Sequence, residues 1–389
     1  MRIKVTPAFA GILKAAFSVS ALSPLGGSER FVYLYLCAKN GCYIYAISSN
    51  DGILCRFNAT EYVEVETKGT GDAFVSKRLA DFIASFGKEL PEETYIETDD
   101  CETENELGVP CSKSKIRLII DGDEAICLNQ AQINRGILDA RVKIEPELYH
   151  DFPTEEMTPV LERAVKCVEG GFNPTPAMTG VLFRVENVSM NVVACDGKRL
   201  FAADWELEIE DGKVPEQTEG IVPGRTLAKV IRLLRGDETG VAICSDAVYL
   251  TSGIVDIRLR VVDARYPNVR NILAAEGERR AVLPAKELLK ASRRVNLVND
   301  GHKISVLTYS FASGCVTARA NTDEFGESSQ TVFCQYSKTP ITIRFSNNLI
   351  LDYLESCGDE NVQAFFNENC PVKFVDSLGT TVIMPLANQ

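Results

Sequence analysis

Six segments of this chain have helical periodicity, and they recur as three pairs along its length. Three of them follow a short strand-like lead and begin the pairs, at residues 6–19, 154–168 and 283–298. The other three lie further along in each third of the chain, at residues 76–87, 223–236 and 346–358. Alternating or β-branched runs typical of short strands lie between them, for example 31–38, 180–187, 190–197, 241–252 and 314–321. The repetition predicts three similar units, each with two helices among many strands.

The domain boundaries are expected in two stretches with turn-forming or acidic residues, 139–155 and 274–279. The predicted domains are therefore 1–148, 149–275 and 276–389. A chain of 389 residues suits this division, because single hydrophobic cores seldom grow beyond roughly 250–300 residues. The polar segment 98–115 is expected to be an irregular surface insertion in the first domain.

Sequence motifs for catalysis are missing. The 13 cysteines are scattered without zinc-site spacing, and no phosphate-binding loop of the form G-x-x-x-x-G-K-[ST] occurs. His150 and His302 are the only histidines, and no local signature pairs either of them with a nucleophilic cysteine. We expect no catalytic residues, no cofactor and no metal site. Reduced thiols and the lack of a long apolar run favour a soluble, cytoplasmic protein.

The cations are segregated although the formal net charge is −13. In the helical segment 223–236, Arg225, Lys229 and Arg232 share one face, and leucine, valine and isoleucine occupy the other. For any single helix, a solvated face is an alternative explanation. The recurrence instead favours a polyanion such as DNA, held without base reading. The cations concerned are Lys14, Lys77, Arg78, Arg163, Lys166, Arg225, Lys229, Arg232, Lys286, Lys290, Arg293 and Arg294.

Five stretches, in order along the chain, resemble motifs of the bacterial sliding clamp family, the beta subunit of DNA polymerase III. They are SVSALSPLGGSER (18–30), VVACDGKRLFAAD (192–204), ARYPNVRNIL (264–273), ARANTDEFGES (318–328) and VIMPLANQ (382–389). The resemblance implies an α+β, ring-forming chain with three copies of the DNA-clamp fold, in which two helices per domain pack on antiparallel sheets. It also implies a head-to-tail homodimer that encircles double-stranded DNA without reading its sequence.

The function implied by the resemblance is that of a processivity factor, a non-catalytic subunit of a DNA-directed DNA polymerase holoenzyme. The implied partners are the DNA polymerase III alpha subunit, the clamp loader and other clamp-motif proteins, with no membrane. Arg30, close to the PLGG stretch, is implied as a further DNA contact, and Leu297 as a residue of the dimer interface.

The resemblance also implies a groove between domains 2 and 3 that binds a short peptide, roughly Gln-Leu-x-Leu-Phe. Flexible apolar side chains with cations at the rim suit such a peptide site. Carried over by position, its residues are Met178, Cys195, Gly197, Lys198, Arg199, Leu200, Pro267, Asn271, Ile272, Ser346, Leu349, Val382, Ile383, Met384, Pro385 and Leu386.

The chain departs from the family pattern in four places. Ser28 and Asn271 stand where the family often has arginine, the C-terminal Arg-Leu is replaced by Ala387-Asn388, and the second helix of the third domain carries Asp352 and Glu355 instead of cations. Two alternatives therefore stay open: a clamp paralogue with an altered or lost replication role, and a thiol-dependent hydrolase. From the residues alone, Leu200 and Met384 would suit a core as well as a groove.

Overall fold

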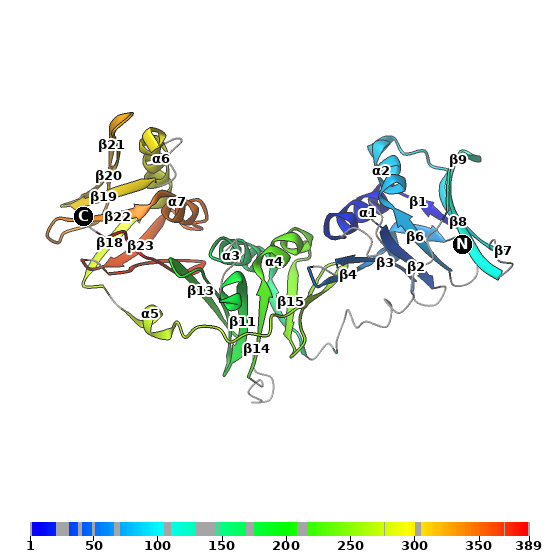
Figure 1. Cartoon of the computed structure of the whole chain (residues 1–389), viewed down its shortest axis with the longest axis horizontal. Coiled ribbons are helices and arrows are strands. Elements are labelled where there is room, and N and C mark those ends of the chain that lie inside the picture. Colours follow the sequence, from blue (N-terminus) through cyan, green and yellow to red (C-terminus); the bar gives the residue numbers. More distant parts are fainter. Residues whose placement is uncertain are drawn as a thin grey trace. The chain divides into compact units, whose positions relative to one another are not determined.

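The computed structural model describes residues 2–20, 31–37, 41–48, 51–65, 71–104, 110–129, 145, 148–168, 175–207, 217–275, 277–299, 305–368 and 370–387 (Figure 1). The chain is α+β, and its strands pair antiparallel. It divides into two compact units: unit 1 contains residues 1–154 and 229–260, and unit 2 contains residues 155–228 and 261–389.

All six predicted helices are present. They are α1 (Pro7–Val19), α2 (Lys77–Ser85), α3 (Thr154–Lys166), α4 (Gly224–Val230), α6 (Ala285–Asn296) and α7 (Asn347–Glu355). Side-chain caps begin the first two, because the hydroxyls of Thr6 and Ser76 accept hydrogen bonds from the backbone three residues later. A short helix that was not predicted, α5 (Arg270–Ala274), lies in the segment before the last domain. Short 3-10 turns are η1 (Thr60–Tyr62), η2 (Gly87–Glu89), η5 (Pro176–Thr179), η6 (Ile231–Leu233) and η7 (Leu297–Asn299).

Unit 1 contains a five-stranded and an eight-stranded sheet. The five-stranded sheet has the order β5 (Val63–Val65), β1 (Arg2–Val5), β7 (Thr94–Glu104), β8 (Pro110–Ile120) and β9 (Asp123–Asn129). The eight-stranded sheet has the order β10 (His150–Pro153), β15 (Glu238–Ile243), β16 (Ala247–Ser252), β17 (Val255–Arg260), β4 (Ile53–Asn58), β3 (Gly41–Ser48), β2 (Phe31–Cys37) and β6 (Gly71–Ser76).

Unit 2 contains an eight-stranded and a four-stranded sheet. The eight-stranded sheet has the order β14 (Thr218–Pro223), β11 (Gly180–Glu186), β12 (Ser189–Cys195), β13 (Arg199–Glu206), β25 (Gly379–Ile383), β24 (Val372–Asp376), β23 (Asn361–Phe366) and β18 (Arg279–Pro284). The four-stranded sheet has the order β21 (Gly326–Phe333), β20 (Cys315–Thr322), β19 (Val306–Ala312) and β22 (Ile341–Ser346). In this unit α3, α6 and α7 lie on one side of the eight-stranded sheet and α5 on the other (Figure 1).

Each eight-stranded sheet is continuous across a predicted domain boundary. In unit 1, β17 pairs with β4, with Ile257 opposite Cys55. In unit 2, β13 pairs with β25, with Leu200 opposite Val382. The predicted middle domain thus gives four strands to each sheet. The limits at 148 and 275 stay predictions.

The prediction of an irregular surface insertion at 98–115 is wrong for the residues of this segment that the structure describes. β7 and β8 continue through it as a long hairpin, with Thr98 opposite Ile116 and Glu104 opposite Pro110. Polar residues do not prevent this pairing, because a β-ladder satisfies backbone groups whatever the side chains are. Residues 105–109 lie outside the described part. Within that part, no helix is long and apolar enough to cross a bilayer.

Candidate functional site

A tight turn joins β12 to β13 and presents two cations. Asp196 accepts backbone hydrogen bonds at Oδ1 from Lys198 (2.8 Å) and Arg199 (2.9 Å). Gly197 has a φ of +83°, a conformation that favours glycine. Asp196 and Gly197 thus form a tight turn between the two strands, and the turn leaves the Lys198 side chain exposed.

Arg199 is held inside unit 2. Its Nε lies 3.1 Å from Asp196 Oδ2, and its Nη1 lies 2.7 Å from Asp352 Oδ2 on α7. Burial disfavours the charged guanidinium, but the hydrogen bond to Asp352 and the nearby charges more than offset this, so the pKa of Arg199 is raised. Because Arg199 is already paired, Lys198 is the more exposed and available cation of the two.

An apolar cluster lies beside the turn, and it is closed. Leu200, Cys195 and Val382 pack together with partly buried Met178, and Leu200 and Val382 are 4% and 3% exposed. The Tyr266 hydroxyl accepts a 2.9 Å hydrogen bond from the Cys195 backbone. Of the predicted groove residues, Cys195, Leu200 and Val382 are buried in this cluster, and Ile383 is buried in the neighbouring core of the last domain. Their contact with a peptide stays a prediction.

The C-terminal segment after β25 runs from the turn to the four-stranded sheet. The Met384 backbone donates to the Lys198 carbonyl (2.8 Å), and the Leu386 backbone donates to the Arg344 carbonyl on β22 (2.7 Å). The Met384 side chain remains 46% exposed. The segment thus holds an exposed, flexible side chain beside Lys198.

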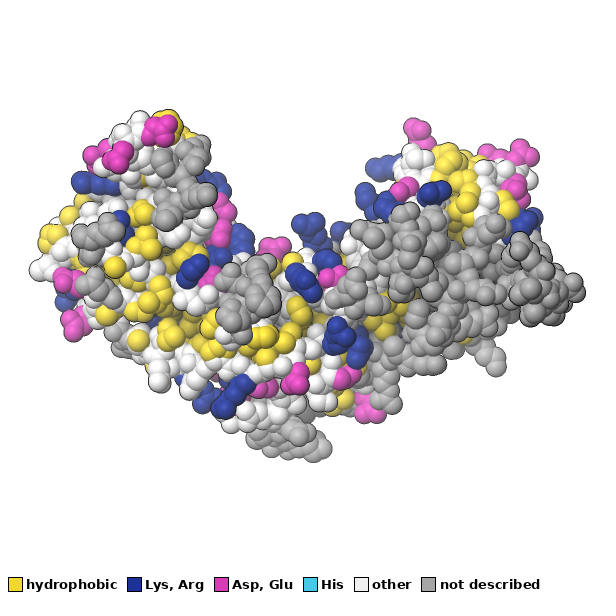
Figure 2. Space-filling view, in the orientation of Figure 1, with side chains coloured by type: hydrophobic (Ala, Val, Ile, Leu, Met, Phe, Trp, Pro, Cys, Tyr) yellow, Lys and Arg dark blue, Asp and Glu magenta, His cyan; other side chains and the backbone are white. Residues whose placement is uncertain are grey.

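The remaining predicted groove residues lie around this segment or on α5. Ile272 on α5 is 45% exposed, and α5 is held near β24 by a 2.8 Å hydrogen bond from Lys373 Nζ to the Leu273 carbonyl. Figure 2 shows apolar side chains gathered over the part of unit 2 where Figure 1 labels α5 and β13.

Two small cavities are lined by further predicted groove residues. Leu349 lines the first together with Arg199, and Pro385 and Leu386 line the second, which lies beside β22. Asn271 is exposed, and Pro267 and Ser346 are half-buried.

The predicted cationic helix faces are confirmed for α4 and α6. Along α4 and η6, Arg225, Lys229 and Arg232 are exposed, and the apolar positions opposite are buried. Lys286, Lys290, Arg293 and Arg294 are likewise exposed on α6. Lys229 is not free, because its Nζ lies 2.5 Å from Asp51 Oδ2.

In unit 1, α1 and α2 present fewer available cations. Lys14 is exposed, as is Arg78. Lys77 is paired with Asp81 one turn along α2, at 2.5 Å. Arg30 and Ser28 lie outside the described residues.

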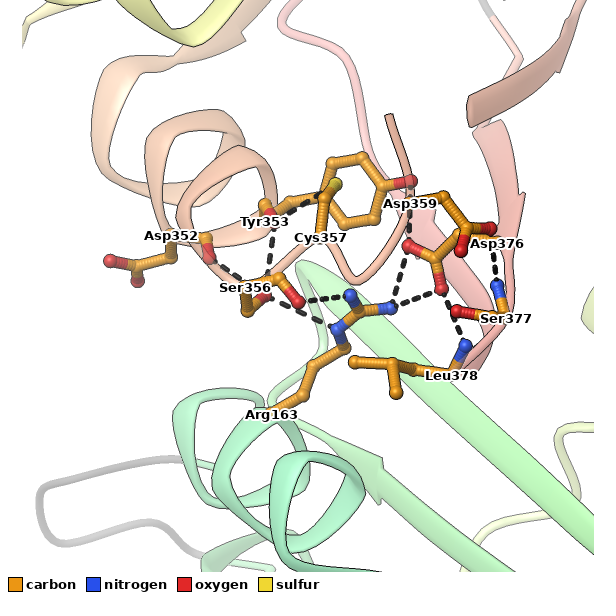
Figure 3. A network of polar contacts seen from close by, with 9 residues as sticks. All are labelled: Arg163, Asp352, Tyr353, Ser356, Cys357, Asp359, Asp376, Ser377 and Leu378. Carbon is orange, nitrogen blue, oxygen red and sulfur yellow. Dashed lines mark hydrogen bonds and ion pairs between the residues drawn. The ribbon is translucent and has the colours of Figure 1, made fainter. Parts of the chain in front are cut away.

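The prediction that Arg163 contacts DNA is wrong. Its side chain is 1% exposed and cannot reach DNA. Its Nη1 lies 2.8 and 2.9 Å from the two oxygens of Asp376, its Nε lies 3.2 Å from Ser356 Oγ, and its Nη2 donates to the Ser356 carbonyl (Figure 3). The face of α3 that carries Arg163 is covered by the end of α7 and the β24–β25 turn. Arg163 therefore joins three elements instead of lining a surface.

Three of the described cysteines do not have the properties of nucleophiles. Burial raises the pKa of Cys42, Cys167 and Cys357 to about 12, whereas a reactive thiol needs a lowered one. Burial also lowers the pKa of His150, against the opposing charge of Asp151. His302 lies outside the described residues. Nothing in the described part of the chain favours the thiol hydrolase.

Comparisons with known proteins give one consistent family. Two family models match in order: DNA polymerase III beta subunit, central domain, at residues 153–268, and the C-terminal domain of the same subunit at residues 270–386. Together they cover more than half of the chain.

Curated relatives and solved structures agree with these matches. The beta sliding clamp of Chlamydia pneumoniae is 23% identical over 303 residues, which are 76% of this chain and 80% of the relative. That of Chlamydia muridarum is 25% identical over 290 residues, or 73% and 76%. The fold is similar to the DNA polymerase sliding clamp from Bacillus subtilis (TM-score 0.80, 17% identity) and to the beta subunit from DNA polymerase of Streptococcus pyogenes (TM-score 0.81, 15% identity), each over 100% of both chains.

Proposed function

Because the chain belongs to the DNA polymerase III beta subunit family, we propose that it works as a sliding clamp: a non-catalytic DNA polymerase processivity factor that encircles duplex DNA. The observation that carries this proposal is the match of two consecutive family models over residues 153–386. The exposed cationic faces of α4 and α6 support it independently, because an encircling protein needs sequence-indifferent contacts with phosphates.

The DNA contacts are assigned to the exposed cations that the structure leaves available. Arg225 and Arg232 on α4–η6, and Lys286, Lys290 and Arg294 on α6, form no ion pair among the described residues. Lys14 is a further exposed candidate. Paired cations such as Lys229 contribute less, since a phosphate must first displace their carboxylate.

The peptide site is assigned to the exposed rim above the closed apolar cluster. Met384 and Ile272 would contact apolar anchors of a partner peptide, and Lys198 would meet its polar or acidic end. Flexible methionine suits a surface that accepts several related peptides. The partners proposed for this site are the DNA polymerase III alpha subunit, the clamp loader and other proteins with the clamp-binding motif.

The assembly is proposed to be a head-to-tail homodimer, a heterologous contact that closes into a ring. Leu297, at the end of α6, is 69% exposed in the single chain. A large apolar side chain exposed to this extent suits burial against a second copy. This residue is the proposed seam contact of the C-terminal domain.

The decisive experiment loads the protein onto circular and linear duplexes with its clamp loader. Retention on circles, followed by release when the circle is cut once, is the expected result for a topological link. Equal retention on both, or on neither, would contradict the proposal.

The peptide site has a separate test. Met384→Ala should lower the affinity for a labelled Gln-Leu-x-Leu-Phe peptide at least about tenfold, since one anchor contributes roughly 2 kcal/mol. Fluorescence anisotropy measures it. The side chain is exposed, so the fold should be unaffected. Phe333→Ala, at an 85% exposed residue on β21, serves as the matched control. Unchanged binding for Met384→Ala in a DNA-retained ring would favour the paralogue with an altered role.

A further inference from the structure

The last residue of α7 meets cations from two other helices of unit 2. Glu355 Oε1 lies 2.8 Å from Arg293 Nη2 on α6, and its Oε2 lies 3.9 Å from Lys166 Nζ at the end of α3. The three side chains are 35%, 59% and 40% exposed, in that order. One carboxylate therefore engages two cations that the sequence predicts for DNA.

Glu355 adds little to the stability of its own helix. A carboxylate at a helix C-terminus interacts unfavourably with the helix dipole, and the last turn of α7 carries no basic residue to compensate. Exposed ion pairs contribute about 0–1 kcal/mol to folding. The main effect of Glu355 is therefore on the charge that Arg293 and Lys166 present to a ligand.

A DNA phosphate that approaches Arg293 must either break the 2.8 Å pair with Glu355 or bind beside its negative charge. Asp352, one turn earlier on α7, has no comparable effect. Its partner Arg199 has a side chain only 12% exposed and so offers no free cation. Glu355 is the acidic residue on α7 whose removal would free two exposed cations.

We infer that Glu355 lowers the affinity of this protein for DNA. It does so because its carboxylate pairs with Arg293 and Lys166, and a phosphate must displace this carboxylate before it can bind either cation. This inference rests on the proposed clamp function. On this inference, the acidic residue on the second helix of the C-terminal domain keeps the affinity for DNA low, which favours movement along the duplex.

The test compares Glu355→Gln with Glu206→Gln, which removes the same charge at an exposed residue at the far end of β13. Glu206 lies seven residues from Arg199 along β13, roughly 23 Å at about 3.3 Å per residue, and forms no ion pair among the described residues. Equilibrium binding of the full-length protein to a short fluorescent duplex is measured by anisotropy across a salt series.

Glu355→Gln should bind at least about threefold tighter at low salt, and its log–log salt slope should steepen by about 0.9 for each cation freed. Glu206→Gln should change neither quantity appreciably. In the double variant Arg293→Gln/Glu355→Gln, much of the gain should disappear. Equal effects of the two single variants, or tighter binding with an unchanged slope, would overturn the role of Glu355.

Retention of the wild-type protein on circular DNA distinguishes a failure of the proposed clamp function from a failure of the inference about Glu355. A wild-type protein that circles do not retain overturns the clamp function itself. A retained wild type with indistinguishable Glu355→Gln and Glu206→Gln overturns only the inference about Glu355.

Discussion

Replacing Arg163 by methionine should destabilise unit 2 strongly. The Arg163 and Asp376 side chains are 1% and 0% exposed, and the guanidinium engages both carboxylate oxygens at 2.8 and 2.9 Å. Asp376 would keep a 3.0 Å hydrogen bond from the Leu378 backbone and a 3.3 Å one from the Tyr353 hydroxyl. It would lose its only close cation among the described residues. Removing one partner of a buried pair costs about 3–5 kcal/mol, because the other charge stays buried and uncompensated.

The double variant Arg163→Met/Asp376→Asn should cost less than the sum of the two single variants. It removes both charges together, so no uncompensated ion remains. A double-mutant cycle should give a coupling free energy of about 2–3 kcal/mol, within the range for residues that share one ion-pair network. Figure 3 shows the contacts that the cycle would dissect.

Urea unfolding followed by tryptophan fluorescence would measure these costs. Trp205 is the single tryptophan and lies half-buried on β13. The ring of Phe201, on the same strand, lies 5.4 Å from the Arg163 guanidinium. The signal therefore reports on the sheet that Arg163 supports.

Arg184→Met provides the matched control. Arg184 lies 2.9 Å from Glu219 in the same unit, but the two side chains are 25% and 47% exposed, so its removal should cost under about 1 kcal/mol. If Arg163→Met costs no more than Arg184→Met, or if the cycle shows no coupling, the buried pair does not hold these elements together.

Three further predictions concern assembly, pH and thiol reactivity. Leu297→Asp should give folded monomers, seen by light scattering, because the side chain is exposed in the single chain; a dimer that persists would remove this residue from the seam. The pKa of His150 is lowered in the folded state from its usual 6.5, so the unfolded chain binds the proton more readily and stability should fall as pH drops below about 6.5. Melting temperatures at pH 8 and 5.5 should differ more for the wild type than for His150→Asn, and equal differences would exclude His150 as the cause. Burial raises the pKa of Cys42 to about 12, so at pH 8 it should be labelled by a disulfide reagent more slowly than exposed Cys127 and Cys370; mass spectrometry of labelled peptides would show the order, and early labelling of Cys42 would contradict it.

Local patterns predicted what depends on local physics. The helix-period segments formed helices, and the strand-like run at 180–187 formed β11. The cationic faces of α4 and α6 are exposed because their opposite faces supply the core. These features depend on residues a few positions apart, which a single sequence displays.

The errors arose where distant segments meet. Arg163 lies one turn before Lys166, and the sequence grouped them as one cationic face, but its partner Asp376 lies 213 residues away. Leu200 was assigned to the wall of a peptide groove; its side chain is buried in a cluster with Val382, and its contact with a peptide stays a prediction. The sequence around Arg163 and Leu200 gives no signal that Asp376 or Val382 lies beside them in the fold. The polar residues of 98–115 likewise hid a hairpin that is held by backbone pairing.

The pairing of β13 with β25 has a consequence for synthesis of the chain. Residues 199–202 align with residues 380–383, so β13 has no neighbour on that side until residues 380–383 have left the ribosome. Until then it presents an unpaired strand edge, which invites pairing with other chains. Stop codons or stalls shortly before residue 379 should thus yield nascent chains that depend on chaperones, whereas release after residue 383 lets unit 2 close its own sheet.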